Sequence, residues 1–227
     1  MKILYEDKEQ IVIHKPAGLA TQTARLGECD LVSEVKNFIS KETGISNPYT
    51  AVINRLDQPV EGIVLFAKNA KAAAGLTEQL KSGTMKKYYY AVVYGHMDRP
   101  DGQLTDYLIK DKRSNLSRVV PESDANGRKA ALRYRVKATL GKMQLLEIQL
   151  LTGRHHQIRV QLSHNGHPLI GDVKYGSSES ISFGKELNAR VPVLCAHRLI
   201  WQHPVTKKEI NICLNPANPV LRHLCEG

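Results

Sequence analysis

The hydrophobic positions of this chain fall mostly into short runs that end at proline, glycine or asparagine, a pattern typical of strands joined by turns. One hairpin is predicted, in which residues 130–138 pair with residues 143–151 around Leu140 and Gly141. Further strands are predicted at residues 11–13, 62–67, 87–94, 193–202 and 210–214, where β-branched, aromatic and other apolar residues concentrate.

Two early segments carry apolar residues at helical spacing instead. The first spans residues 31–43 and is followed by Gly44, which can end a helix. The second is rich in alanine and runs from a cap at Asn69 to about residue 81, with Gly83 beyond its end.

A third helix is predicted over residues 154–165, with Thr152 as its N-cap and Gly166 after its end. Residues 97–128 carry prolines, glycines and charges, and we expect long loops with short strands there. Because strands outnumber helices and mostly follow one another through short turns, the predicted fold class is α+β with a largely antiparallel sheet.

Net charge indicates the class of partner, and cysteine content indicates the cellular location. A formal net charge of +10 over 227 residues, with a pI of about 9.4, indicates a polyanionic partner, most often nucleic acid. The four cysteines form no C-x-x-C pair and suit a reducing, cytoplasmic location. The charged N-terminal segment and the lack of any apolar run near 18 residues predict neither a signal peptide nor a membrane partner.

An arginine and an aspartate, Arg55 and Asp57, flank Leu56 just ahead of the predicted strand at residues 62–67. Residues two apart in an extended segment point the same way, so the arginine would favour the charged form of the carboxylate. An ionised, positioned aspartate can act as a nucleophile or as a base. An ion pair that closes a strand end explains the same two residues, so the pattern alone leaves both interpretations open.

The stretch LTGRHHQIRV at residues 151–160 places Arg154 in the first turn of the predicted helix, where free N–H groups and the guanidinium would form an anion site. His155 and Arg159 would share a face of that helix. A solvated basic helix is the alternative. The nearby histidines lack the H-E-x-x-H spacing, and no metal or other cofactor is expected.

Aromatic and basic residues suggest further contacts with nucleic acid. On the strand at residues 87–94, Lys87 and Tyr89 would share one face, and a tyrosine can stack on a base or transfer a proton. Ordinary sheet packing explains the same tyrosine. Residues 110–137 hold nine Lys or Arg against three acids, which suits either a phosphate backbone or a solvated loop.

Taken together, these stretches resemble the RluA family of RNA pseudouridine synthases. The sequence NRLD at residues 54–57 with Gly62 resembles the family motif H-R-L-D…G around its catalytic aspartate, and KYYYA at residues 87–91 with Gly95 resembles K-x-Y-x-A…G. TGRHHQIRV at residues 152–160 resembles T-G-R-x-H-Q-[IL]-R-V. Similar matches at residues 15–19, 166–172 and 194–204 extend the resemblance from about residue 3 to about residue 216.

The resemblance implies a single catalytic domain over residues 1–227, with a mixed, mainly antiparallel sheet of the pseudouridine synthase type and two halves flanking an RNA cleft. Because the family signature begins near Met1, no additional N-terminal RNA-binding domain is expected. The implied reaction converts specific uridines to pseudouridine in structured ribosomal or transfer RNA, without a metal or nucleotide cofactor. We expect a monomer.

By resemblance, Asp57 is the catalytic carboxylate, which either attacks the sugar or removes a sugar proton. Arg159 would pair with Asp57, and Tyr89 would stack on the uracil and take part in its deprotonation. Arg55 would hold the gap left by a flipped base. The other expected substrate-binding residues are Lys87, Arg154, His156, Gln157 and Leu194.

Three places depart from the family pattern: Asn54 replaces a histidine, Val60-Glu61 replaces Thr-Ser, and Cys195 replaces a histidine. These departures bear on substrate choice rather than on the chemistry. One alternative is a non-catalytic RNA-binding or ribosome-assembly protein of the same fold, for which Asn54 is the only support. Another is an RNA N-glycosidase or other hydrolase, for which Glu61 is the nearby candidate for a second carboxylate.

Overall fold

The computed structural model describes residues 1–23, 27–111 and 113–226. The chain divides into two compact units, each built from two separate segments. Unit 1 combines Met1–Lys86 with Ala196–Asn215, and unit 2 combines Lys87–Cys195 with the chain from Pro216 onward. The prediction of a single domain is not tested by this division and stays a prediction.

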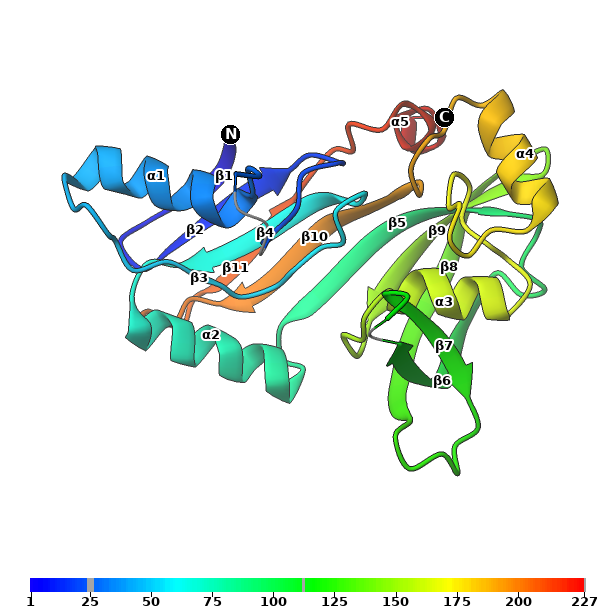
Figure 1. Ribbon diagram of the computed structural model, residues 1–227, viewed down its shortest axis with the longest axis horizontal. Helices are drawn as coiled ribbons and strands as arrows, with labels where there is room; N and C mark the ends of the chain where they lie inside the picture. Colours follow the sequence, from blue (N-terminus) through cyan, green and yellow to red (C-terminus); the bar gives the residue numbers. More distant parts are fainter. Residues whose placement is uncertain (24–26, 112, 227) are drawn as a thin grey trace. The chain divides into compact units, whose positions relative to one another are not determined.

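The sheet of unit 1 is mainly antiparallel, as predicted. Its strands follow in the order β1 (Lys2–Glu6), β2 (Gln10–Lys15), β4 (Glu61–Ala67) and β10 (Leu194–Gln202), with β3 (Ala51–Val52) paired to β4 and β11 (Glu209–Cys213) paired to β10 (Figure 1). All seven residues of β4 are buried, which agrees with the apolar run in the sequence.

The two helices of unit 1 begin and end where the sequence predicts. In α1 (Leu31–Thr43), the Asp30 side chain accepts the N–H of Ser33. In α2 (Ala70–Ser82), Asn69 accepts the N–H of Ala72, and three apolar residues are buried on the side that contacts β4. Glycines in the left-handed conformation, Gly44 and Gly83, follow the two helices.

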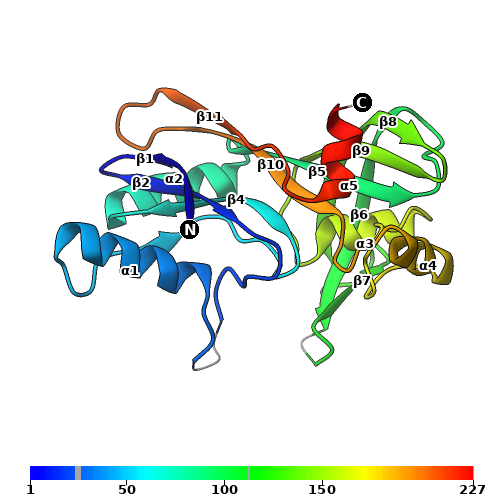
Figure 2. The ribbon, with the colours of Figure 1, turned by 90° about the horizontal axis from the view of Figure 1, so that it is seen from above.

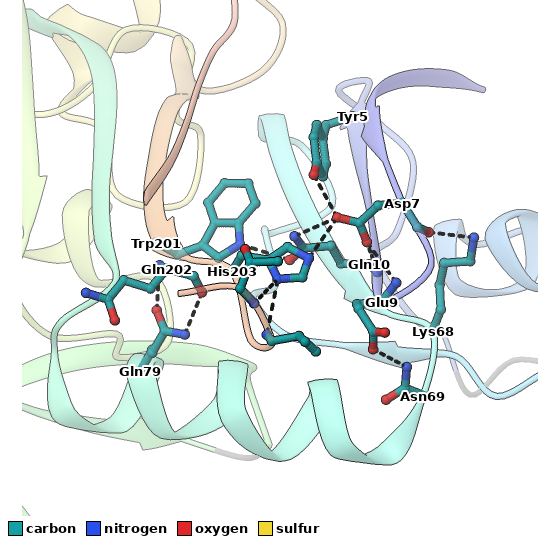
Figure 3. A network of polar contacts seen from close by, with 12 residues as sticks. Tyr5, Asp7, Glu9, Gln10, Lys68, Asn69, Gln79, Trp201, Gln202 and His203 are labelled. Carbon is teal, nitrogen blue, oxygen red and sulfur yellow. Dashed lines mark hydrogen bonds and ion pairs between the residues drawn. The ribbon is translucent and has the colours of Figure 1, made fainter. Parts of the chain in front are cut away.

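Hydrogen bonds around Asp7 join the turn between β1 and β2 to the turn between β10 and β11 (Figure 3). The Asp7 carboxylate accepts from Tyr5 Oη at 2.7 Å and from His203 Nε2 at 3.1 Å. His203 Nδ1 accepts two backbone N–H groups, so its proton resides on Nε2. Trp201 Nε1 also donates to Gln10 Oε1 at 2.9 Å. This network fixes strands that are distant in sequence within unit 1.

The sheet of unit 2 is antiparallel between all of its named neighbours. Its strand order is β5 (Lys86–Tyr94), β9 (Met143–Leu150), β8 (Arg128–Leu140), β6 (Asp101–Asp111) and β7 (Leu116–Val120). The hairpin of β8 and β9 confirms the prediction. The expectation of long loops over residues 97–128 is wrong, since β6 is an 11-residue strand. Over its first six residues, exposed residues alternate with half-buried ones. Because the exposed residues are mostly polar, the sequence of β6 resembles that of a loop.

Three helices lie in the described part of unit 2. The helix α3 (Gln157–His164) lies against β6 and β7, and α5 (Pro219–Glu226) packs against β8 (Figure 2). The sequence predicts neither α4 (Ser178–Glu186) nor α5, because α4 has only two apolar residues, Ile181 and Phe183, and the apolar positions of α5 span only eight residues. Among the described residues, no helix combines the length and the apolar character needed to cross a membrane.

Candidate active site

Asp57 is half-buried in the loop between β3 and β4 of unit 1, and Asn54 ties that loop to β4. The Asn54 side chain donates to the carbonyl of Ile63 at 3.0 Å and accepts the N–H of Leu65 at 2.9 Å. These bonds need a donor and an acceptor side by side, which an amide offers and an imidazole, with its nitrogens on different ring edges, does not. The replacement of the family histidine by Asn54 therefore has a structural explanation in this chain.

The residues on either side of Asp57 are fixed through their backbone. The Thr21 hydroxyl donates to the carbonyl of Leu56 at 2.8 Å and accepts its N–H at 3.2 Å. The carbonyl of Gln58 accepts the N–H of Gly18 at 2.9 Å, and the carbonyl of Asp57 accepts the N–H of Val60 at 3.0 Å. This loop therefore holds the backbone of Asp57 in one conformation.

Lys15, at the end of β2, is fully buried beside this loop. Its ammonium donates to the carbonyls of Pro16, Leu19 and Gln58 at 2.9, 2.7 and 3.1 Å. Burial lowers the pKa of Lys15 to about 8, and the negative charges of Asp57 and Glu61 oppose that shift. Lys15 therefore places a positive charge near two carboxylates in the interior of unit 1.

Glu61, the first residue of β4, is also buried, and its Oε2 lies 3.6 Å from His14 Nε2. The carboxylate that replaces the family's small polar residue thus lies among basic groups, His14 and Lys15. Arg55 is exposed and Leu56 is buried, so that the arginine and Asp57 flank a buried leucine.

In unit 2, Lys87 and Tyr89 lie on one face of β5, as predicted. Tyr89 is buried and Lys87 is half-buried, and burial lowers the pKa of Lys87. A Cβ atom added to Gly153 would lie 3.4 Å from Lys87 Nζ, so the loop before α3 lies over this lysine.

The prediction of a helix from residue 154 with Thr152 as its N-cap is wrong, because α3 begins at Gln157 and His156 is its N-cap residue. The Gln157 side-chain oxygen accepts the Thr152 hydroxyl at 2.8 Å and the N–H of Arg154 at 2.9 Å, which keeps the preceding residues in a turn. Arg154 is exposed, and its Nε donates to the carbonyl of Lys129 at 2.9 Å. The predicted anion site in the first helical turn is therefore not formed by Arg154.

The helix α3 is buried on every side over its first six residues, so the alternative of a solvated basic helix is wrong. Its polar side chains have partners in the interior. Gln161, for example, donates to Asp106 at 2.7 Å and to the carbonyl of Ala130 at 3.2 Å.

Arg159 and Asp172 form a buried, two-pronged ion pair. Arg159 Nε lies 2.7 Å from Asp172 Oδ2 and Nη2 lies 2.8 Å from Oδ1, with each residue at most 3% exposed. The guanidinium also lies over the ring of Tyr175, 5.1 Å from its centroid. The pairing of Arg159 with Asp57 stays a prediction. Leu194, at the start of β10, is buried.

Two stacked histidines complete the group of polar residues next to α3. The rings of His155 and His156 lie 3.7 Å apart, and His156 has a left-handed backbone with φ of 54°. Few non-glycine residues adopt that conformation, and those that do concentrate at functional sites. Ser117 Oγ lies 2.9 Å from His155 Nδ1, and Tyr175 Oη lies 2.7 Å from His156 Nδ1.

Residues 9–164 match the RNA pseudouridylate synthase family. The chain belongs to this family. An uncharacterised RNA pseudouridine synthase of Bacillus subtilis, YhcT, is 32% identical over 99% of this chain and 71% of its own length. Ribosomal large subunit pseudouridine synthase C of Vibrio cholerae is 28% identical over 92% of this chain, which spans only 64% of that relative.

A solved human structure, RNA pseudouridylate synthase domain containing 4, has a TM-score of 0.80 and 22% identity, covering 99% of this chain and 91% of its own. That likeness confirms the predicted α+β fold. The family match confirms the predicted enzyme class, RNA pseudouridine synthase.

Three residues of the pseudouridine synthase to which the sequence assigns no role lie next to the predicted ones: Lys15 and Asp172, which lie in the family matches at residues 15–19 and 166–172, and Tyr175. The local signal for Lys15 is a lysine at the end of the apolar strand β2. Asp172 and Tyr175 lie in a turn whose backbone N–H groups bond to the Asp172 carboxylate, at 3.0 Å for Lys174 and 3.3 Å for Tyr175. An aspartate followed by its own turn is the local signal that could have marked them.

Proposed function

We propose that this pseudouridine synthase isomerises specific uridines in ribosomal or transfer RNA, with Asp57 as the catalytic carboxylate. The fixed loop around Asp57 is the observation that carries the proposal. The Thr21 hydroxyl bonds the backbone of Leu56 before it, the Gly18 N–H bonds the carbonyl of Gln58 after it, and Asn54 anchors the loop to a fully buried strand. A carboxylate that must meet one atom of a flipped nucleotide benefits from such a rigid support.

The reaction detaches uracil from the ribose, turns it, and rejoins it through carbon, so reactant and product have the same atoms. In this proposal, Asp57 attacks the sugar or removes a sugar proton, Arg159 orients Asp57, and Tyr89 stacks on the uracil and assists its deprotonation. Arg55, Lys87, Arg154, His156, Gln157 and Leu194 are the proposed substrate contacts.

Ribosomal RNA is supported by the relatives that carry the name ribosomal large subunit pseudouridine synthase, those of Vibrio cholerae and Zymomonas mobilis. The net charge of +10 is consistent with either class of RNA. The non-catalytic alternative rests on Asn54, and the bonds of that residue to β4 give it a role that does not involve chemistry. A cytoplasmic location and a monomeric state stay predictions.

The test compares RNA from cells that lack the gene with RNA from cells that carry it. Pseudouridines are mapped by carbodiimide labelling and primer extension across ribosomal and transfer RNA. We expect one or a few sites to disappear and to return with the wild-type gene, but not with Asp57→Asn. The exposed Asp98→Asn is the matched control and should restore them.

Purified protein gives the second readout on transcripts that contain the mapped uridine. Asp57→Asn should abolish turnover and leave the RNA dissociation constant within about threefold, because the change removes a charge and little shape. Turnover by Asp57→Asn near the wild-type rate would overturn the catalytic role. If wild-type protein binds RNA and forms no pseudouridine on any transcript, the non-catalytic alternative holds.

A further inference from the structure

Burial lowers the pKa of both Lys15 and Lys87, but the two ammonium groups differ in their partners. Lys15 Nζ donates to three backbone carbonyls, at distances of 2.7–3.1 Å. Lys87 Nζ makes no hydrogen bond or ion pair with any residue that the structure describes. A partly desolvated positive charge without a partner is unfavourable, and such groups concentrate at functional sites.

The side chain of Lys87 lies on an apolar face of the unit 2 sheet. Its neighbour across the strand pair is Leu150 on β9, which pairs in turn with Leu132 on β8, and both leucines are buried. The carboxylate of β9, Glu147, lies opposite Tyr90 and therefore belongs to the other face. Burial is accordingly the cause of the lowered pKa of Lys87, and no carboxylate of the described residues opposes it.

A fixed loop lies over the Lys87 ammonium without closing it off. A Cβ atom added to Gly153 would lie 3.4 Å from Lys87 Nζ. The Gln157 side-chain oxygen holds this loop, because it accepts the Thr152 hydroxyl at 2.8 Å and the Arg154 N–H at 2.9 Å. Within the described part of the chain, Lys87 Nζ is not among the polar atoms that are sealed from solvent without a partner. A ligand can therefore reach it.

We propose that Lys87 Nζ binds a phosphate oxygen of the RNA, next to the nucleotide whose base lies on Tyr89. The inference rests on the proposed function, in which Tyr89 stacks on the uracil and Lys87 contacts the substrate. The two residues lie on one face of β5, about 7 Å apart along the strand. Before the reaction begins, phosphate is the group of RNA that carries a full negative charge, so it supplies the counter-charge that Lys87 lacks in the free protein.

The surroundings of Lys87 strengthen such a contact. A charge-assisted hydrogen bond among apolar side chains is strong, because little water competes with it. A second negative group forms only during the reaction, on the detached uracil. A lysine that served the uracil would change the rate of the bound complex and leave RNA affinity unchanged, so experiments can separate the two contacts.

The first test removes the charge and keeps the length of the side chain. Lys87→Met should raise the RNA dissociation constant about tenfold in filter binding, with an oligonucleotide that contains the mapped uridine. It should also lower the slope of log Kd against log salt by about 0.7, the value for one phosphate on a single strand. The matched control is Lys86→Met, the exposed neighbour on the other face of β5, which should change Kd less than about twofold.

Urea unfolding of both variants checks that the fold is intact. Lys87→Met should be at least as stable as wild type, since methionine suits the apolar face. A lower single-turnover rate at saturating RNA with an unchanged dissociation constant would place the ammonium at the uracil and overturn the proposal.

The second test removes the charge from the RNA instead. Oligonucleotides carry a neutral methylphosphonate in place of the phosphate on the 5′ or the 3′ side of the target uridine. At one of these two positions the replacement should raise Kd about tenfold for wild type and less than about twofold for Lys87→Met. A replacement six nucleotides away should affect both proteins equally. Equal factors for the two proteins at both flanking positions would overturn the phosphate contact.

The third test reads the lysine itself. Protein labelled with ¹³C at lysine Cε is titrated with base, free and bound to the oligonucleotide, and the Lys87 signal is the one missing from Lys87→Met. A bound phosphate favours the ammonium form, so the lowered pKa of Lys87 should rise on binding. RNA binding then takes up a proton between the two pKa values, and wild-type affinity should fall with rising pH there, relative to Lys87→Met.

An unchanged or lower pKa of Lys87 in the complex would contradict the proposal. Absence of pseudouridine from wild-type reactions would count against the proposed function instead. In that case a raised pKa of Lys87 on an RNA that binds unmodified would still support the phosphate contact, and an unchanged one would overturn it.

Discussion

The backbones of Gly62 and Ala196 lie too close together for a side chain to fit between them. A Cβ atom on Gly62 would lie 2.5 Å from the Ala196 nitrogen and 2.6 Å from its Cβ, and Gly62 has a φ of +139°. Few residues other than glycine adopt that conformation. Strand β4, which follows the Asp57 loop, is therefore packed directly against β10.

The substitution Gly62→Ala should destabilise the protein by about 2–4 kcal/mol, since it adds both a clash and backbone strain. Urea unfolding followed by circular dichroism measures the change. The control is Gly75→Ala in the middle of α2, where the added Cβ would meet only Pro204 at 3.6 Å. That change should stabilise the protein by about 0.5–1 kcal/mol, because alanine favours a helix. Similar effects at the two positions would contradict the close packing of β4 and β10.

Removal of the Thr21 hydroxyl should loosen the loop that carries Asp57. Thr21→Val leaves the buried carbonyl and N–H of Leu56 without their partner, at a cost of about 1–3 kcal/mol. We expect kcat to fall more than RNA affinity, as measured by single-turnover pseudouridine formation and by filter binding. Thr50→Val, whose hydroxyl makes one long contact of 3.4 Å, is the control and should be nearly neutral. A loss of affinity with unchanged kcat would show that this loop serves binding only.

The buried ammonium of Lys15 should make stability depend on pH in a defined window. Its pKa is about 8 in the folded protein against an ordinary value of 10.5. Between these values the unfolded chain binds more protons than the folded one, so the free energy of unfolding rises with pH. Relative to Lys15→Met, wild type should gain up to about 3 kcal/mol between pH 8 and pH 10.5, and nothing below pH 7.

Parallel urea titrations of wild type and Lys15→Met across that range measure the gain, because titration of all other groups is common to both. A constant difference between the two proteins would mean that Lys15 keeps its ordinary pKa. A decrease with pH would mean that the carboxylates of Asp57 and Glu61 outweigh its burial.

The hydroxyl of Tyr89 is predicted to take part in proton transfer. Tyr89→Phe keeps the ring and removes only the hydroxyl, so pseudouridine formation should fall by about 10²-fold or more while the RNA dissociation constant stays within about threefold. Tyr94→Phe on the same strand keeps its ring contact with Phe183 and serves as the control. Unchanged turnover in Tyr89→Phe would leave Tyr89 as a stacking surface.

The sequence is a good guide to this fold wherever the signal is local. The spacing of apolar residues predicts α1, alanine content and the Asn69 cap predict α2, and a glycine marks the end of each helix. The start of α3 was misplaced because the Gln157 side chain, and not Thr152, organises the turn before it. The sequence does not predict strand β6, because its exposed face is polar and its composition therefore resembles that of a loop.

In the candidate site, too, local motifs can be recognised in the sequence, whereas contacts between distant residues cannot. Asp57, Tyr89 and Arg159 are predicted from motifs of adjacent residues, and their catalytic roles stay predictions. Asp172, which pairs with Arg159, lies 13 positions away, and the bond between Ser117 and Tyr175 joins residues 58 positions apart. No periodicity or local pattern encodes such contacts, because they exist only once β7, α3 and the turn after Asp172 have come together.

Each unit is built from two separate segments, so neither unit can complete its fold until its second segment has been synthesised. Unit 1 includes Ala196–Asn215, which the ribosome makes only after all of Lys87–Cys195. Until then β4 lacks its neighbouring strand β10. The Gln10 side chain also lacks its hydrogen-bond donor, Trp201, which lies 191 positions later. Such late, distant pairing slows folding and leaves a strand edge open to wrong partners. The loop that carries Asp57 is therefore synthesised before residues 196–215, and the unit around it is completed only after residue 215 has been added.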